Sequence, residues 1–289
     1  MKSINLALRI ASFAVITAGL ASANRAPLPN NSSYVGLPNP KTVSFSGRVG
    51  AAAAVGGGAF SGSVSPNPSS TLGALETTFW CIDSQLFFNM NEQNMTANIT
   101  RLDQVASAAA DTVRYQNINA LAPTNPGWTN DVNGAASGLV SATERFRMAA
   151  YLVTLYDGFS SNPTSLSGGP KNDAIQRAIW GIMHNNVSPT GGTSTFDAYL
   201  GTDSQATKES RSGYWRDLAV ASFTSVDMTR WAVVSWVAEG GLLTTGTPDS
   251  PNKQTFLVQV VPEPGFYGAL ALGLSGLVVA VRRRSSTKA

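Results

Sequence analysis

The chain has 289 residues, of which 43% are hydrophobic and 13% are charged, with one cysteine and one histidine. One cysteine excludes a framework of internal disulfides, and one cysteine with one histidine excludes a zinc site built from such ligands of this chain alone; no cofactor is indicated. The formal net charge is +3, but basic residues cluster at both ends, so the segment between carries more acidic than basic side chains. We therefore expect no nucleic-acid-binding face.

The first 23 residues have the three parts of a secretory signal peptide in the right order. Lys2 and Arg9 give a basic start, the run from Ile10 to Leu20 is apolar and uncharged, and small residues precede the expected cleavage after Ala23. The apolar run is short for a membrane span. The pattern predicts export, with signal peptidase as a processing partner.

The chain after the expected cleavage site begins with a polar, proline-rich segment. Residues 24–40 have this composition, so we expect a flexible lead-in. Residues 42–49 then alternate apolar and polar side chains, which predicts a half-buried strand. The Gly/Ala/Ser-rich residues 51–65 are either the return strand of a hairpin or low-complexity chain.

Four more segments are dense in strand formers, and three between them have helical spacing. The expected strands are residues 77–83, 85–88, 229–237 and 254–261. The expected helices are residues 146–156, 173–183 and 204–221. Strands first, helices in the middle and strands last predict an α+β ectodomain over residues 41–261, β-rich with a helical insertion.

The C-terminal segment combines a proline motif, a short apolar run and an arginine cluster. The motif residues are Pro262, Glu263 and Pro264. The uncharged run from Gly265 to Val281 would rise about 26 Å as a helix, at the short end of what crosses a bilayer. The run is followed by Arg282, Arg283 and Arg284. These arginines would keep the end of the chain cytoplasmic, which predicts a transmembrane helix with a tail stop.

In this order, residues 262–289 resemble the PEP-CTERM sorting signal of Gram-negative bacteria. The resemblance implies that an exosortase cleaves near the Pro-Glu-Pro motif and that the helix anchors only the inner-membrane precursor. The ectodomain would then be secreted to the cell surface or the extracellular matrix of a biofilm. A plain membrane anchor is the alternative.

The single cysteine lies in the apolar sequence Phe79-Trp80-Cys81-Ile82-Asp83. An unpaired cysteine in an exported protein either reacts, pairs with another chain or is protected. The flanking side chains predict burial, and a buried free cysteine often acts only as a small hydrophobic residue. From these residues alone, Cys81 is either reactive or an inert part of the core.

Three motifs together resemble the thioester (TQXA) domain of bacterial surface adhesins, over about residues 41–261. They are Trp80–Asp83, Ile175–Trp180 and Gln254–Leu257. The resemblance implies that the cysteine thiolate attacks a glutamine side-chain carbonyl, expels ammonia and leaves an intramolecular thioester. It places the bond between Cys81 and Gln254, with Gln176 as site support or as the alternative thioester partner.

The resemblance also implies a function in covalent adhesion, with the protein as acyl donor rather than as a turnover enzyme. An amine on a surface protein or matrix polymer would displace the sulfur and form a stable amide. Such a site needs a close thiol and amide and must exclude water. We expect Phe79, Trp80 and Trp180 to shield it.

Each of these residues also has an ordinary structural explanation. Gln176 would complete a capping box if Asp173 were the N-cap, Gln254 would face solvent from a strand, and Asp83 would face water or cap a turn. A Cys–His hydrolase using His184 has no local nucleophile signature to support it. The main alternative function is a passive exopolysaccharide-associated structural protein with an inert buried Cys81.

Overall fold

A computed structural model describes eleven segments of the chain. They are residues 27–30, 32–36, 40–52, 57–66, 72–83, 94–108, 112–114, 141–160, 169–184, 196–236 and 254–261. The expected signal peptide (1–23), the expected strand at 85–88 and the sorting signal (262–289) lie outside these residues. Among the described helices, none has the length and apolar character that a membrane span requires.

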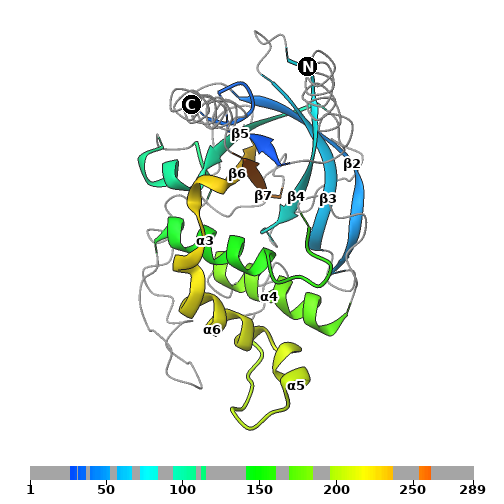
Figure 1. The fold of residues 1–289 in the computed structure, drawn as a ribbon, viewed down its shortest axis with the longest axis vertical. Helices are drawn as coiled ribbons and strands as arrows, with labels where there is room; N and C mark the ends of the chain where they lie inside the picture. Colours follow the sequence, from blue (N-terminus) through cyan, green and yellow to red (C-terminus); the bar gives the residue numbers. More distant parts are fainter. Residues whose placement is uncertain are drawn as a thin grey trace, which may run out of the picture.

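Six antiparallel strands close into a barrel (Figure 1). They are β2 (Lys41–Ala52), β3 (Gly57–Ser65), β4 (Leu75–Cys81), β5 (Met95–Arg101), β6 (Trp231–Trp236) and β7 (Phe256–Val261). Their order around the barrel is β7-β4-β3-β2-β5-β6, and pairing of β6 with β7 closes the ring. A two-residue strand, β1 (Leu28–Pro29), adds to β7 in parallel. Strands from both ends of the described chain are therefore neighbours.

The helices occur between β5 and β6 in the chain and gather at one end of the barrel (Figure 1). The α-helices are α3 (Ala142–Val153), α4 (Pro170–His184), α5 (Gln205–Glu209) and α6 (Ser212–Ser222). Three short 3₁₀ segments are η1 (Leu102–Ser107), η2 (Phe223–Ser225) and η3 (Met228–Arg230). Helix α3 begins with a capping box in which Ser141 and Glu144 exchange side-chain and backbone hydrogen bonds.

Two hydrophobic clusters lie on opposite sides of the barrel wall. Inside the barrel, the Phe45 ring lies 4.8 Å from that of Phe79 and 5.0 Å from that of Phe256, measured between centroids. Outside it, α4 contacts β2 and β3, and apolar side chains of α3, α4 and α6 share the second cluster with outward-facing strand residues. Successive side chains of a strand point to opposite faces, so Cys81 belongs to the inner cluster and Trp80 to the outer one.

The expected α+β class agrees with this architecture in outline, and the doubtful return strand is β3, which pairs with β2. The expected third helix is divided in two, because α5 ends at Glu209 and α6 starts at Ser212. Strand β5 is not predicted from the sequence. Its sequence, MTANITR, is polar at several positions, although most of its side chains are buried between β2 and β6.

Two described parts of the expected lead-in (24–40), residues 27–30 and 32–36, lie against the barrel. Pro29 and Leu28 pair with the end of β7, and Leu28 is fully buried. The side chain of Tyr34 is also buried, and its hydroxyl donates to the carbonyl of Gly73 at 2.5 Å. Polar composition predicts a lead-in without structure, but these few apolar side chains fill the inner cluster of the barrel.

Candidate functional site

The ends of two neighbouring strands place the predicted cysteine and glutamine together. Cys81 is the last residue of β4 and pairs with Phe256, the first residue of β7. The pairing continues one step further, because the amide of Ile82 donates to the carbonyl of Thr255 at 3.1 Å. Because the strands are antiparallel, the chain just after β4 runs beside the chain just before β7. Gln254 therefore lies beside the residues that follow Cys81.

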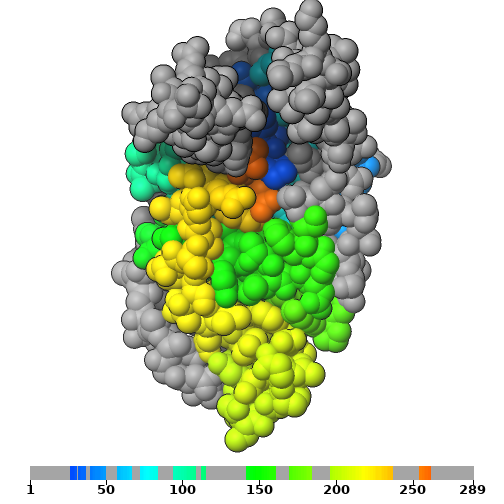
Figure 2. Space-filling view, viewed as in Figure 1, coloured from blue at the N-terminus to red at the C-terminus, as the bar shows by residue number. Residues whose placement is uncertain are grey.

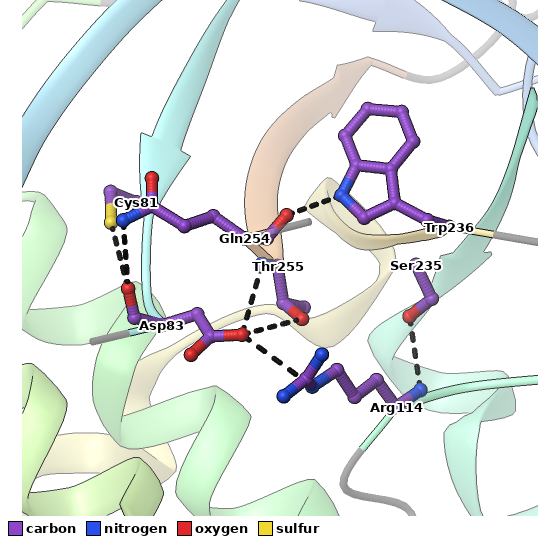
Figure 3. A network of polar contacts seen from close by, with 7 residues as sticks. All are labelled: Cys81, Asp83, Arg114, Ser235, Trp236, Gln254 and Thr255. Carbon is purple, nitrogen blue, oxygen red and sulfur yellow. Dashed lines mark hydrogen bonds and ion pairs between the residues drawn. The ribbon is translucent and has the colours of Figure 1, made fainter. Parts of the chain in front are cut away.

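The thiol of Cys81 and the side-chain amide of Gln254 converge on one acceptor (Figure 3). Cys81 Sγ donates to the carbonyl oxygen of Asp83 at 3.4 Å, and Gln254 Nε2 donates to the same oxygen at 3.2 Å. The sulfur and the amide nitrogen are thus no further apart than the sum of these two distances. Cys81 is 1% and Gln254 7% exposed, so the expectation that Gln254 faces solvent from a strand is wrong.

The surroundings of the thiol strongly favour its protonated form. Burial raises the pKa of Cys81 to about 12, and the negative charge of Asp83 adds to this effect. The hydrogen bond to the Asp83 carbonyl, the indole of Trp180 and the charge of Arg48 lower the pKa by less. A thiol with this pKa is a poor free nucleophile at neutral pH.

This raised pKa predicts a stability that falls at high pH whenever the thiol is free. Between the ordinary value of 9.0 and about 12, the unfolded chain loses the thiol proton while the folded protein keeps it. The contribution of the thiol to the free energy of unfolding should therefore be fully present below pH 9. Above pH 9 the free energy of unfolding should fall by about 1.4 kcal/mol per pH unit. Urea titrations of a Gln254→Ala variant at pH 8 and pH 10 measure this slope. The control is the double variant Cys81→Ala, Gln254→Ala. If stability fell no more steeply in Gln254→Ala than in this control, the raised pKa of the Cys81 thiol would be contradicted.

Gln176 is fully buried and connects α4 to two strands. Its Oε1 accepts from the amide of Gly58 at 2.6 Å and from the hydroxyl of Tyr156 at 2.8 Å. Its Nε2 donates to the carbonyl oxygen of Cys81 at 3.1 Å. It therefore contacts the backbone of the cysteine, in the position of a support. Gln176 lies in the second turn of α4, so the expected capping box with Asp173 is wrong.

A glycine makes room for this support. A Cβ on Gly57 would lie 2.4 Å from Cδ and Oε1 of Gln176, which is closer than real Cβ contacts. The glycine-rich composition of this segment therefore has a local reason, because the amide side chain packs directly on the backbone of β3.

Asp83 is fully buried, in contrast to the expected exposed or turn-capping role. Its Oδ2 accepts from the amide and the hydroxyl of Thr255, at 3.3 and 3.4 Å, and pairs with Arg114 Nε at 3.5 Å (Figure 3). The amide of Arg114 in turn donates to Ser235 Oγ at 3.1 Å. The network fixes the backbone of Asp83, whose carbonyl oxygen accepts from the thiol of Cys81 and from the amide of Gln254.

The three aromatic residues expected to shield the site occupy different positions. Phe79 lies inside the barrel on the same face of β4 as Cys81. Trp80 points to the opposite face and stacks on Tyr156, the hydrogen-bond partner of Gln176, with centroids 5.8 Å apart. Trp180 packs against the inner cluster; its buried Nε1 interacts with the sulfur and has no oxygen or nitrogen acceptor among the described residues.

Three residues of the site carry no signal in the sequence. Arg114 is separated from Asp83 by more than one element and lies in no periodic pattern, and Thr255 resembles any strand residue. The indole of Trp236 donates to the carbonyl of Gln254, a contact that strand propensity cannot indicate. The side chain of His184 lies outside the described part of the structure.

The side chains of the site are buried, although part of the segment 254–261, orange in Figure 2, is visible beside the green helical layer. Among the described residues, no three histidine, cysteine or acidic side chains form a group that could hold a metal. No family model, curated protein or solved structure matches the chain. A buried thiol beside a primary amide is therefore the feature from which function has to be argued.

Proposed function

We propose that the ectodomain forms a thioester between Cys81 Sγ and the side-chain carbon of Gln254, and uses it for covalent adhesion to amine-bearing partners. The observation that carries the proposal is the shared acceptor: thiol and amide both donate to the carbonyl oxygen of Asp83. Holding the two groups on one acceptor replaces a bimolecular encounter with an intramolecular one, which favours attack by a thiol of such low acidity.

The bond-forming step balances without any added reagent. The sulfur attacks Cδ of Gln254, the C–S bond forms, the C–N bond breaks, and the thiol proton leaves with the nitrogen as ammonia. Burial of Cys81 and Gln254 excludes most water, which protects the acyl group from hydrolysis. A partner amine then attacks the same carbon, forms an amide and returns the proton to the sulfur. The protein is consumed as a donor and is not an enzyme.

The cellular part of the proposal depends on the two ends of the sequence. The signal peptide would direct export, and the motif from Pro262 to Pro264 with the apolar run and Arg282–Arg284 would recruit an exosortase. The product would be a surface or extracellular-matrix protein of a Gram-negative bacterium, anchored in the inner membrane only as a precursor. Its partners would be amine-bearing surface proteins or matrix polymers.

Intact mass of the purified protein tests the thioester directly. We expect a mass lower than that of the sequence by one ammonia, and addition of one methylamine on incubation, with release of one alkylatable thiol. Full sequence mass together with no methylamine uptake would contradict the proposal. Cys81→Ala serves as the control, because without the sulfur neither ammonia loss nor amine uptake is possible.

A second function is favoured by one observation. The raised pKa of the Cys81 thiol, caused by burial, is also what an inert core cysteine shows. The chain would then be a passive exopolysaccharide-associated structural protein. In that case the protein has the full mass of its sequence, takes up no methylamine and is alkylated at Cys81 only after unfolding.

A further inference from the structure

We propose that the indole N–H of Trp180 stabilises negative charge on the Cys81 sulfur, both when the thioester forms and when an amine breaks it. This inference rests on the proposed thioester and gives Trp180 a part in the chemistry besides the shielding expected of it. It accounts for a polar atom that is buried beside the sulfur without an oxygen or nitrogen acceptor among the described residues.

Helix α4 brings Trp180 to the side of the barrel wall on which the sulfur lies. Gln176 and Trp180 are four residues apart in this helix, so their side chains lie on one face of it. Gln176 fixes that face to the cysteine, because its Nε2 donates to the carbonyl oxygen of Cys81 at 3.1 Å. Among the described side chains of α4, that of Trp180 alone packs against the inner cluster, to which Cys81 belongs. The indole therefore approaches the sulfur from the turn that follows Gln176.

The indole nitrogen holds a hydrogen that has no strong acceptor while the sulfur is neutral. Nε1 of Trp180 is buried and has no oxygen or nitrogen partner in the described part of the chain. An indole nitrogen can only donate, and a neutral sulfur is a weak acceptor. A buried N–H in this position costs free energy, and it gains a strong acceptor once the sulfur is negative. In agreement with this, the interaction with the indole lowers the pKa of the Cys81 thiol, against the larger opposite effect of burial.

Negative charge develops on the sulfur in both steps of the proposed chemistry. In formation, Sγ attacks Cδ of Gln254 while its proton passes to the departing nitrogen. In aminolysis, the N–C bond forms, the C–S bond breaks with its electron pair going to the sulfur, and a proton moves from the attacking nitrogen to the sulfur. The indole keeps its own proton throughout. Because its hydrogen bond is stronger to the charged sulfur than to the neutral one, it lowers the barrier of each step.

An isosteric amino acid separates the N–H of Trp180 from the shape of its ring. In 3-benzothienylalanine a sulfur atom stands in place of the indole N–H, so the side chain still covers the site but has nothing to donate. With this residue at position 180, uptake of methylamine by the purified protein, followed by intact mass, should slow by about tenfold or more. In the Gln254→Ala background, where no thioester forms, the same replacement should not lower the urea midpoint, because the N–H that it removes has no oxygen or nitrogen acceptor among the described residues. Equal rates of uptake, or a slower rate together with a lower midpoint, would overturn the inference.

The same replacement at Trp215 is the matched control. The indole of Trp215 lies in the outer cluster and donates to the carbonyl oxygen of Glu209 at 2.7 Å. Its replacement should lower the urea midpoint and leave the uptake of methylamine unchanged, which is the reverse of the result at position 180. Full sequence mass after replacement at position 180, with an unchanged midpoint and with ammonia loss in the control, would show that formation also needs the N–H and would support the inference. A parent protein that loses no ammonia would instead contradict the thioester itself.

Discussion

A Gln254→Ala variant should have the full mass of its sequence and should take up no methylamine. The substitution removes the acyl group beside Cys81 Sγ, so neither the C–S bond nor the loss of ammonia is possible. Cys81→Ala should give the same result, because it removes the nucleophile. Intact mass before and after incubation with methylamine measures both effects, each of which is complete rather than partial.

Gln259→Ala is the matched control for this pair. Gln259 lies on the same strand, β7, and its side chain is only partly buried and away from Cys81. It should leave ammonia loss and amine uptake unchanged. If Gln254→Ala retained the mass deficit while Gln176→Leu abolished it, the bond would belong to the other glutamine, and the geometry of the Asp83 carbonyl would have another purpose.

Gln254→Ala should also lower the free energy of unfolding by more than the loss of the local contacts of Gln254 explains. The thioester would join the end of β4 to the residues just before β7, two strands that are neighbours in the barrel. It would close a loop of most of the ectodomain, and in the chain-entropy account such a link stabilises by up to about 5 kcal/mol. A lower urea midpoint for Gln254→Ala than for Gln259→Ala would show this contribution.

The sequence predicts the pair of segments at the site but not the contacts that make it. Cys81 and Gln254 stand out because each lies in a short motif at the edge of a strand-forming run, and a strand pairing joins those two runs. Asp83 is misassigned, because an acidic residue after a strand is usually solvated; the partner that permits its burial, Arg114, has no pattern of its own. Long-range partners of this kind follow from tertiary packing alone.

The alternation of side chains along a strand explains why two of the residues expected to shield the sulfur lie in different clusters. Adjacent aromatic residues look equivalent in a list, but Phe79 and Trp80 point to opposite faces of β4 and belong to different clusters. Only the register of the barrel shows which of the two faces the sulfur. The helical spacing of Gln176 and Trp180, by contrast, is read directly from the sequence, and both side chains do reach the region of Cys81.

A Gln176→Leu variant should be destabilised by an amount on the order of 4 kcal/mol. The substitution keeps an apolar side chain of similar size but leaves three buried groups without their partner: the amide of Gly58, the hydroxyl of Tyr156 and the carbonyl of Cys81. Urea unfolding of the variant and the parent protein measures the loss, and Gln205→Leu is the control. Gln205 is an exposed helical glutamine bonded to Glu209, so its replacement should change the free energy of unfolding by less than about 0.5 kcal/mol.

The same variant separates a supporting role for Gln176 from a direct one. As a support, Gln176 holds the backbone of Cys81 against α4, so the folded fraction of Gln176→Leu should still lose ammonia, though more slowly and less completely. A stability equal to that of the parent protein would contradict the buried contacts. Gln176 donates to the carbonyl oxygen of Cys81, whereas Gln254 lies beside its sulfur. Replacement of Gln176 should therefore mainly lower stability, and replacement of Gln254 should abolish formation of the thioester.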